Sequence, residues 1–407
     1  MAENTSGPFT RPSSNAVLPA SGAQSICPPV SATGTFSRMS RPLPKLVIDQ
    51  ISRSRAGLGK VKALVGLDGF VDTIIHVVAR RESARSFTRM GQMSDFGRLV
   101  GAAAGLSANV EFVTKMVKLG GNGPIMAQAL ASQGPRVTYI GNLGSPALHP
   151  VFSDLARQAK VISIAEPGYT DAIEFEDGKL MCGKHDSLRD VTWATLIKHI
   201  PEPRLIAMFQ EASLIALVNW TMLPFTSAIW AKIQARVAPK LTGGKRWLFI
   251  DLADPAKRTP ADIGAALKAI SRFQKYFRVI LGLNLQEGRQ IGAILGLPAC
   301  DGSEGKVAAL AGSIREKLGI DTVVIHPTAF AAGADATGLS SVAGPYTEKP
   351  KITTGAGDHF NAGFCTARLL GCDLAESLQM GVATSGYYVR NAKSPSLDEL
   401  SRFLKIL

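Results

Sequence analysis

The 407-residue chain lacks several features that would assign a class of protein at once. It has no apolar run of about 18 residues, so no membrane-spanning helix is predicted. Its five cysteines are scattered and include no Cys-x-x-Cys pair, which argues against a zinc site or a disulfide framework and favours a reducing, cytoplasmic location. No His-Glu-x-x-His sequence and no Ser, His and Asp order of a hydrolase is found, so neither a zinc enzyme nor a hydrolase is indicated.

The net charge of the chain does little to decide between classes of binding partner. The formal net charge is +13, but the lysines and arginines are dispersed and form no run of five or six. A basic surface helps to attract anionic substrates such as nucleotides and sugar phosphates. Nucleic-acid binding is therefore only a minor alternative, and we predict neither a nucleic-acid nor a membrane partner.

The first 45 residues differ in composition from the rest. They are rich in Ser, Pro, Ala and Gly and have no apolar periodicity. Such a stretch buries too little apolar surface to offset its ordering entropy, so a disordered tail is predicted for residues 1–45. Its composition resembles that of an organelle transit peptide, but it lacks an amphipathic helical pattern, and a plain flexible extension is the preferred interpretation.

Residues 46–407 are typical of one folded domain. Short apolar runs, such as 136–141 and 247–252, alternate with helical patterns along the chain. This alternation predicts an α/β fold with a mostly parallel central sheet flanked by helices. Hairpin-like pieces within residues 73–118 and 162–182 do not fit that sheet, and we predict that they form a small β-sheet lid over its edge.

A glycine-rich stretch near the end carries the clearest indication of chemistry. It reads Thr-Thr-Gly-Ala-Gly-Asp over residues 353–358 and leads into a helical run. Glycine allows tight turns and close approach of a ligand, and a helix N-terminus offers free N–H groups to an anion. These features predict a phosphate or oxyanion site with Asp358 as proton acceptor. A simple helix cap is the alternative, because short glycine motifs also match by chance.

The full run continues as His-Phe-Asn-Ala-Gly-Phe over residues 359–364 and resembles the C-terminal signature of the ribokinase-like (PfkB) carbohydrate kinases. The resemblance extends over roughly residues 61–404. It implies a ribokinase-like three-layer fold. It also implies phosphoryl transfer from ATP, with Mg²⁺, to a hydroxyl of a sugar, nucleoside or related polyol.

The same resemblance implies roles for individual residues of this stretch. Asp358 corresponds to the general base, and the N–H groups of Gly355, Ala356 and Gly357 correspond to the anion hole. Thr354 is implied to contact phosphate or ribose. His359 beside the base is expected to be a helix residue turned elsewhere.

Acceptor-binding residues are expected after the first predicted strand, residues 61–67, because ligands bind outside the carboxyl ends of strands in open α/β sheets. Asp68 and Asp72 lie there, where the resemblance implies an acid that holds the sugar. Asp72 matches better, and a turn acid is the alternative for one of the two. A Gly-Gly-Asn-Gly-Pro run is similar to the family's N-terminal glycine signature and implies that Gly121 and Asn122 contact the sugar. Ile125 stands where the family usually has an amide.

Metal-binding residues are implied by an Asn-x-x-Glu sequence. Asn284 and Glu287 match the element that organises Mg²⁺ and its waters in this family. Oxygen ligands with retained waters suit Mg²⁺. The alternative is a capping box, in which the two residues close the start of a helix.

Nucleotide contacts differ from the usual pattern of the family. His326 and Thr328 stand where a Thr-x-Gly-x-x-Gly element is expected against the nucleotide, while Gly333 remains further along. Ile352 replaces an Asp that is linked to monovalent-cation binding, which argues against potassium activation of the usual kind.

These departures motivate a second hypothesis, a non-catalytic nucleotide- or sugar-binding protein on the same fold. Asp358 in an intact Gly-Ala-Gly-Asp sequence argues against it, because a binding protein would not require that acid. The expected substrate is a small sugar or nucleoside. A homodimer is compatible with the resemblance, because lid strands often pair between subunits in this family.

Overall fold

The computed structural model describes residues 42–407. Residues 1–41 of the predicted disordered tail lie outside the described residues. For residues 42–45 the prediction of disorder is wrong, because they form the start of a helix. Pro42 precedes helix α1 (Leu43–Leu58), and the buried Val47 and Ile51 of this helix pack against the C-terminal helices. Proline suits a helix start because the first N–H groups have no intrahelical partner.

The larger of two sheets has nine strands in the order β14-β13-β12-β11-β10-β9-β1-β5-β6. Strands from β6 to β12 are parallel, while β13 and β14 form an antiparallel hairpin at one edge. The bounds are β1 (Lys62–Leu67), β5 (Arg136–Gly141), β6 (Lys160–Ser163), β9 (Leu214–Val218), β10 (Arg246–Asp251), β11 (Phe277–Leu283), β12 (Thr322–Ile325), β13 (Phe330–Asp335) and β14 (Gly338–Ala343).

Two features of this sheet differ from the expectation. Residues 162 and 163 fall in the range expected for the lid, but β6 pairs parallel with β5 in the large sheet. The β13–β14 hairpin was not predicted, because Ala, Gly and Ser dominate it and have low strand propensity. Strand pairing stabilises them instead, because β13 pairs with both β12 and β14.

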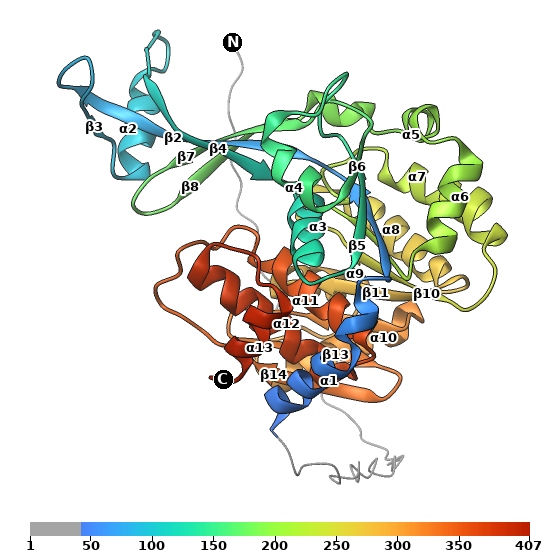
Figure 1. Ribbon diagram of the computed structural model, residues 1–407. Coiled ribbons are helices and arrows are strands. Elements are labelled where there is room, and N and C mark those ends of the chain that lie inside the picture. Colours follow the sequence, from blue (N-terminus) through green and yellow to red (C-terminus); the bar gives the residue numbers. More distant parts are fainter. Residues whose placement is uncertain (1–41) are drawn as a thin grey trace, which may run out of the picture. The chain divides into compact units, whose positions relative to one another are not determined.

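Helices cover both faces of the large sheet (Figure 1). Their bounds are α3 (Asn122–Ser132), α4 (Ser153–Gln158), α5 (Trp193–His199), α6 (Glu202–Glu211), α7 (Thr226–Lys232), α8 (Pro260–Phe273), α9 (Leu285–Ile294), α10 (Glu304–Leu318), α11 (Ala356–Leu370), α12 (Leu374–Asn391) and α13 (Leu397–Leu404). Short 3₁₀ turns occupy Pro150–Phe152, Asp186–Asp190, Ala238–Lys240 and Pro255–Lys257, and a π-helical turn follows α7 at Ile233–Val237. No helix within residues 42–407 is both long and apolar enough to cross a membrane.

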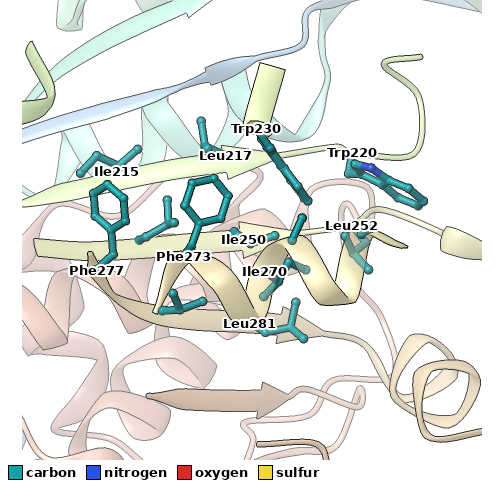
Figure 2. Packing of buried hydrophobic residues seen from close by; sticks show 14 of the residues in the cluster. Ile215, Leu217, Trp220, Trp230, Ile250, Leu252, Ile270, Phe273, Phe277 and Leu281 are labelled. Carbon is teal, nitrogen blue, oxygen red and sulfur yellow. The ribbon is translucent and has the colours of Figure 1, made fainter. Parts of the chain in front are cut away.

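Side-chain alternation along the buried strands divides the core into two. Successive residues of a strand point to opposite faces, so Ile215 and Leu217 of β9 enter one cluster while Leu214 and Ala216 enter the other. Figure 2 shows part of the first cluster, with labelled side chains from β9, β10, β11, α7 and α8 and the loops after β9 and β10: Ile215, Leu217, Trp220, Trp230, Ile250, Leu252, Ile270, Phe273, Phe277 and Leu281. The second cluster packs α3, α11 and α12 on the opposite face.

The smaller sheet is the predicted lid. Its strands are β2 (Phe70–Arg81), β3 (Phe87–Arg89), β4 (Phe112–Gly120), β7 (Gly168–Glu174) and β8 (Lys179–Lys184), and helix α2 (Met93–Ala102) belongs with it. Strand β2 pairs with β4 on one side and with β7 on the other, as Figure 1 shows. The lid has a small apolar cluster of its own around Ile75 and Phe175, against which Met93 and Phe96 of α2 pack.

Close contact between α11 and α12 depends on Gly363. A Cβ at this residue would lie 2.8 Å from the carbonyl oxygen of Met380 and closer still to Thr384 Oγ1. We expect Gly363→Ala to lower the free energy of unfolding by about 1–3 kcal/mol through overpacking, measured by denaturant unfolding. The control is Gly264→Ala in α8, where a Cβ meets no atom within 4 Å, and it should raise stability by roughly 0.5–1 kcal/mol. Equal effects of the two variants would contradict this packing argument.

Candidate active site

Two cavities of about 420 Å³ each open at the carboxyl ends of the parallel strands. We call the first the lid cavity, because the lid residues Thr170, Met181 and Gly183 line it. We call the second the α12 cavity, because Val382 and Val389 of α12 line it. The first turn of α11 borders both, so any group that bridges the cavities passes this helix start.

The start of α11 has the backbone that the glycine motif predicts. Gly355 lies at φ 91°, in the left-handed region that favours glycine, and a Cβ there would also approach Ile125 within 3.3 Å. The first N–H groups of a helix have no intrahelical partner and carry the positive end of its dipole. Gly355 lines the lid cavity, and Ala356 and Gly357 line the α12 cavity. The N–H of Ala356, which the sequence predicts as part of the anion hole, instead donates to the carbonyl oxygen of Thr353 at 3.1 Å. An anion between the cavities would therefore face the amides of Gly355 and Gly357.

Asp358 lies in the first turn of α11 and faces the lid cavity. Its side chain is only 7% exposed, and its Oδ1 accepts a hydrogen bond of 2.9 Å from Nδ2 of Asn122, at the start of α3. Burial and then the nearby Asp251 carboxylate raise the pKa of Asp358 well above its ordinary value. A carboxylate with a raised pKa is a stronger proton acceptor.

Asp72 and Asp68, which the sequence left as alternatives, occupy different places. Asp72 lines the lid cavity together with the predicted Gly121 and Asn122. Burial raises the pKa of Asp72, and the Lys118 ammonium partly offsets this effect. Gly120 makes room for this carboxylate, because a Cβ there would lie 2.5 Å from Asp72 Cγ.

Asp68 closes the start of α3 and lines neither cavity. It is fully buried, and its carboxylate accepts the N–H groups of Asn122 and Gly123, each at 2.9 Å, and Nδ2 of Asn219 at 2.8 Å. Its pKa is raised to about 6 by burial. The turn-acid alternative therefore describes the geometry of Asp68, which holds the start of α3 and the side chain of Asn219.

Asn284 and Glu287 form a capping box at the start of α9. Asn284 Oδ1 accepts the N–H of Glu287 at 2.9 Å, and Glu287 Oε2 accepts the N–H of Asn284 at 2.8 Å. Glu287 also accepts the N–H of Asp254 through Oε1 at 2.8 Å. Both residues nonetheless border the site, Asn284 at the α12 cavity and Glu287 at the lid cavity.

Two further buried acidic groups, Asp251 and Glu287, lie close enough to influence each other's charge. Burial and the Glu287 carboxylate raise the pKa of Asp251 to about 7, and burial raises that of Glu287. Within residues 42–407 there is no group of three or more His, Cys, Asp or Glu side chains arranged to hold a metal ion. Mg²⁺ in phosphoryl-transfer sites needs only one or two carboxylates, with phosphates and waters as the remaining ligands. The donor set fits such a shared site and not an all-protein cage.

The predicted nucleotide residues are only partly brought together. His326 and Thr328 line the α12 cavity, and the His326 ring packs 4.6 Å from that of Phe360. Burial lowers the pKa of His326 to about 4, so the ring is neutral. Gly333 instead lies inside β13 opposite Val324 and lines neither cavity.

Thr354 lines the lid cavity, and its neighbour Thr353 lines the α12 cavity. No charged side chain of the described residues lines the α12 cavity, whose walls include Pro345 and Tyr346. Apolar and aromatic walls of this kind suit a flat, uncharged ring.

Several residues of the site were not identified from the sequence. Asn219 and Asp251 end the neighbouring strands β9 and β10, and the rule that ligands bind at the carboxyl ends of strands could have indicated them. His185 and Lys257 also line the lid cavity. His185 lies in a loop and Lys257 in a 3₁₀ turn, and the local sequence of neither contains a recognisable signal.

The comparisons with known proteins agree with this geometry. A family model described as "Prokaryotic ketohexokinase" matches residues 49–406. A ketohexokinase of Haloferax volcanii is 30% identical over 344 residues, which cover 84% of this chain and 90% of that protein. The chain belongs to the prokaryotic ketohexokinase family. It is a carbohydrate kinase, as its membership of the family shows, and its substrate is a small sugar.

Solved structures confirm the ribokinase-like fold of this kinase. A ribokinase of Arabidopsis thaliana, solved with ribose and ATP, matches with a TM-score of 0.58 at 15% identity over 85% of this chain and 99% of that one. Phosphofructokinase-2 of Escherichia coli matches with a TM-score of 0.59 at 15% identity over 86% and 99% of the two chains. The predicted α/β sheet with a smaller separate sheet is thereby confirmed.

Buried carboxyls should make the ligand-free kinase less stable as the pH rises. The pKa values of Asp68 and Asp251 are about 6 and about 7 in the folded protein, against an ordinary 3.8. A raised pKa gives stability that is complete below the unfolded value and is lost as the pH rises through the folded value. The buried rings of His326 and His359, whose pKa values are lowered to about 4, act in the opposite direction over much of the same range, so the test is the difference between two proteins. We expect the melting temperature of Asp251→Asn to rise relative to that of the parent by about 2–5 °C between about pH 4 and about pH 7. A parallel pH dependence of the two proteins would contradict this.

Proposed function

We propose that this kinase transfers the γ-phosphoryl group of ATP to a hydroxyl of a neutral ketose in the lid cavity, with Asp358 as general base. The observation that carries the proposal is the position of the first turn of α11. Asp358 faces the lid cavity from this turn, while Ala356 and Gly357 face the α12 cavity. Phosphoryl transfer needs this juxtaposition of acceptor, base and anion-binding amides.

The lid cavity has the chemistry of a site for a neutral sugar. Asp72, Asn122 and Thr170 offer hydrogen-bonding groups for hydroxyls. Acidic side chains line the cavity at Asp72, Asp254, Glu287 and Asp358, whereas Lys257 already pairs with Asp254 at 3.2 Å. An anionic sugar phosphate would meet repulsion there. The names of the matched family and relative support a ketose as the acceptor.

The α12 cavity suits the nucleotide. Its apolar wall would hold the base, and the amide of Gly357 would hold the terminal phosphates at the helix start. Glu287, Asn284 and waters would hold Mg²⁺ beside these phosphates. The cation would supply neutralisation of the charge that develops on the transferred group.

In this mechanism Asp358 accepts the proton of the attacking hydroxyl. Asn122 donates to Oδ1 of Asp358 and leaves the other carboxylate oxygen for the sugar. Burial raises the pKa of this acid, so the proton is held strongly once transferred. The lid residues Met181 and Gly183 border the same cavity and would keep water from the phosphoryl group.

The base assignment is tested with Asp358→Asn, which keeps the shape of the side chain and removes its basicity. We expect ADP release with Mg²⁺ and a ketohexose to fall by at least about 100-fold. A panel of aldoses, sugar phosphates and nucleosides identifies the acceptor. Asp398→Asn on the exposed face of α13 is the matched control and should behave as the parent. Sugar or nucleotide binding without turnover in the parent protein would instead favour the non-catalytic hypothesis.

The role of Asp72 is tested separately through the affinity for the acceptor. Asp72→Asn keeps the size of the side chain but loses one charged acceptor, and a hydrogen bond to a charged group contributes about 1.5–3 kcal/mol. We therefore expect KM for the sugar to rise roughly tenfold or more, with KM for ATP unchanged. Asp171→Asn, at a half-buried lid residue paired with Lys184 that does not line the lid cavity, is the control. An unchanged KM for the sugar in Asp72→Asn would remove this residue from the acceptor site.

A further inference from the structure

The backbone carbonyl groups of Thr354 and Gly355, just before α11, each accept a hydrogen bond from a buried side chain that lines neither cavity. The hydroxyl of Tyr388, on α12, donates to the carbonyl oxygen of Thr354 at 2.9 Å. The Nδ1 of His359, on α11, lies 2.7 Å from the carbonyl oxygen of Gly355. Neither Tyr388 nor His359 lines the lid cavity or the α12 cavity.

These contacts fix the direction of the amides in the glycine turn. The peptide between Thr354 and Gly355 is not among the cis bonds of the chain, and in a trans peptide the C=O and N–H groups point in opposite directions. Holding the Thr354 carbonyl toward Tyr388 therefore turns the N–H of Gly355 away from α12. The next peptide is held at both ends, because the N–H of Ala356 donates to the carbonyl of Thr353 at 3.1 Å.

The chemistry of His359 determines which of its nitrogens carries hydrogen. A carbonyl oxygen can only accept, so Nδ1 must donate to Gly355, and the neutral ring then accepts the hydroxyl of Ser394 at Nε2, 2.8 Å away. Burial lowers the pKa of His359 to about 4 and raises that of Tyr388 to about 12, which keeps both groups in these states near neutral pH. The two rings stack with centroids 3.5 Å apart and an angle of 13°.

We propose that Tyr388, His359 and Ser394 are positioning residues that aim the backbone amides of Gly355 and Gly357 at the transferring phosphoryl group. This inference rests on the proposed phosphoryl transfer. The three side chains, which we call the carbonyl clamp, touch neither substrate. They act by restricting a turn whose glycines would otherwise be free to rotate, and a preorganised anion site stabilises the transition state more than the bound substrates.

The test compares Tyr388→Phe with Tyr387→Phe in steady-state kinetics with ATP, Mg²⁺ and the best ketose. Tyr388→Phe removes only the clamp hydroxyl and keeps the stacked ring. Tyr387, the adjacent residue of α12, packs against Phe403 and hydrogen-bonds Glu399, outside both cavities. We expect kcat to fall roughly tenfold in Tyr388→Phe, a fraction of the 100-fold or larger loss that follows removal of an anion-hole donor. KM for the sugar and the affinity for ADP should stay within about twofold, and Tyr387→Phe should match the parent.

A second pair of variants tests the histidine. The side-chain amide of an asparagine can donate in place of Nδ1, so His359→Asn should keep most of kcat. Leucine has no donor, so kcat should fall in His359→Leu. Ser394→Ala removes the hydroxyl that holds Nε2 and should lower kcat by a smaller factor. Thermal melting and ADP binding show which variants are folded. If His359→Leu does not fold, the inference is tested with the two single variants Tyr388→Phe and Ser394→Ala.

The outcomes separate this inference from the proposed function. If the parent turns over sugar and folded Tyr388→Phe retains its kcat, the clamp is refuted while the kinase activity stands. A rise in KM or a loss of ADP affinity at constant kcat would also refute it, because ground-state binding would then be affected. If the parent phosphorylates no sugar, the proposed function fails and the clamp fails with it.

Discussion

The structure depends on the burial of acidic groups at the carboxyl edge of a parallel sheet. Asp68, Asp251 and Asp358 are withdrawn from water at the ends of β1 and β10 and at the start of α11. Burial raises the pKa of each, so the site is less stable when these groups are charged. Helix starts offset part of this cost, as the α3 amides do for Asp68. The buried carboxyl groups at this edge, which include the proposed base Asp358, are therefore also groups that destabilise the folded protein when they are charged.

Small residues make this arrangement possible. Gly120 leaves space for the carboxylate of Asp72, and Gly363 lets α11 approach α12 closely. The position of α11 decides which amides face each cavity, and the approach of α12 brings Tyr388 to the Thr354 carbonyl. Core packing on one face of the sheet thus determines the geometry of the proposed anion site at its edge.

The sequence predicted the sheet strands well because buried parallel strands are continuous apolar runs. Strand β5 (Arg136–Gly141) has the predicted bounds, and β10 (Arg246–Asp251) lies within one residue of the predicted run 247–252. The helix over Leu43–Leu58 and the hairpin of β13 and β14 were missed. The apolar residues of α1 pack against helices more than 300 positions away, and the hairpin has little intrinsic strand preference. The local sequence of a segment does not indicate which distant residues it will pack against, so these elements could not be predicted from it.

For the site, the sequence by itself determined which chemical groups are present: the Gly-Ala-Gly turn, Asp358 and the pair of acids after the first strand. Motifs carry this information because backbone freedom and side-chain type are local properties. Only the tertiary structure decided that Asp72 faces the lid cavity while Asp68 caps α3, that Gly333 lies inside a strand, and that His359 turns toward Gly355. The direction of a side chain depends on packing between elements that are distant in the chain, and a single local pattern does not specify it.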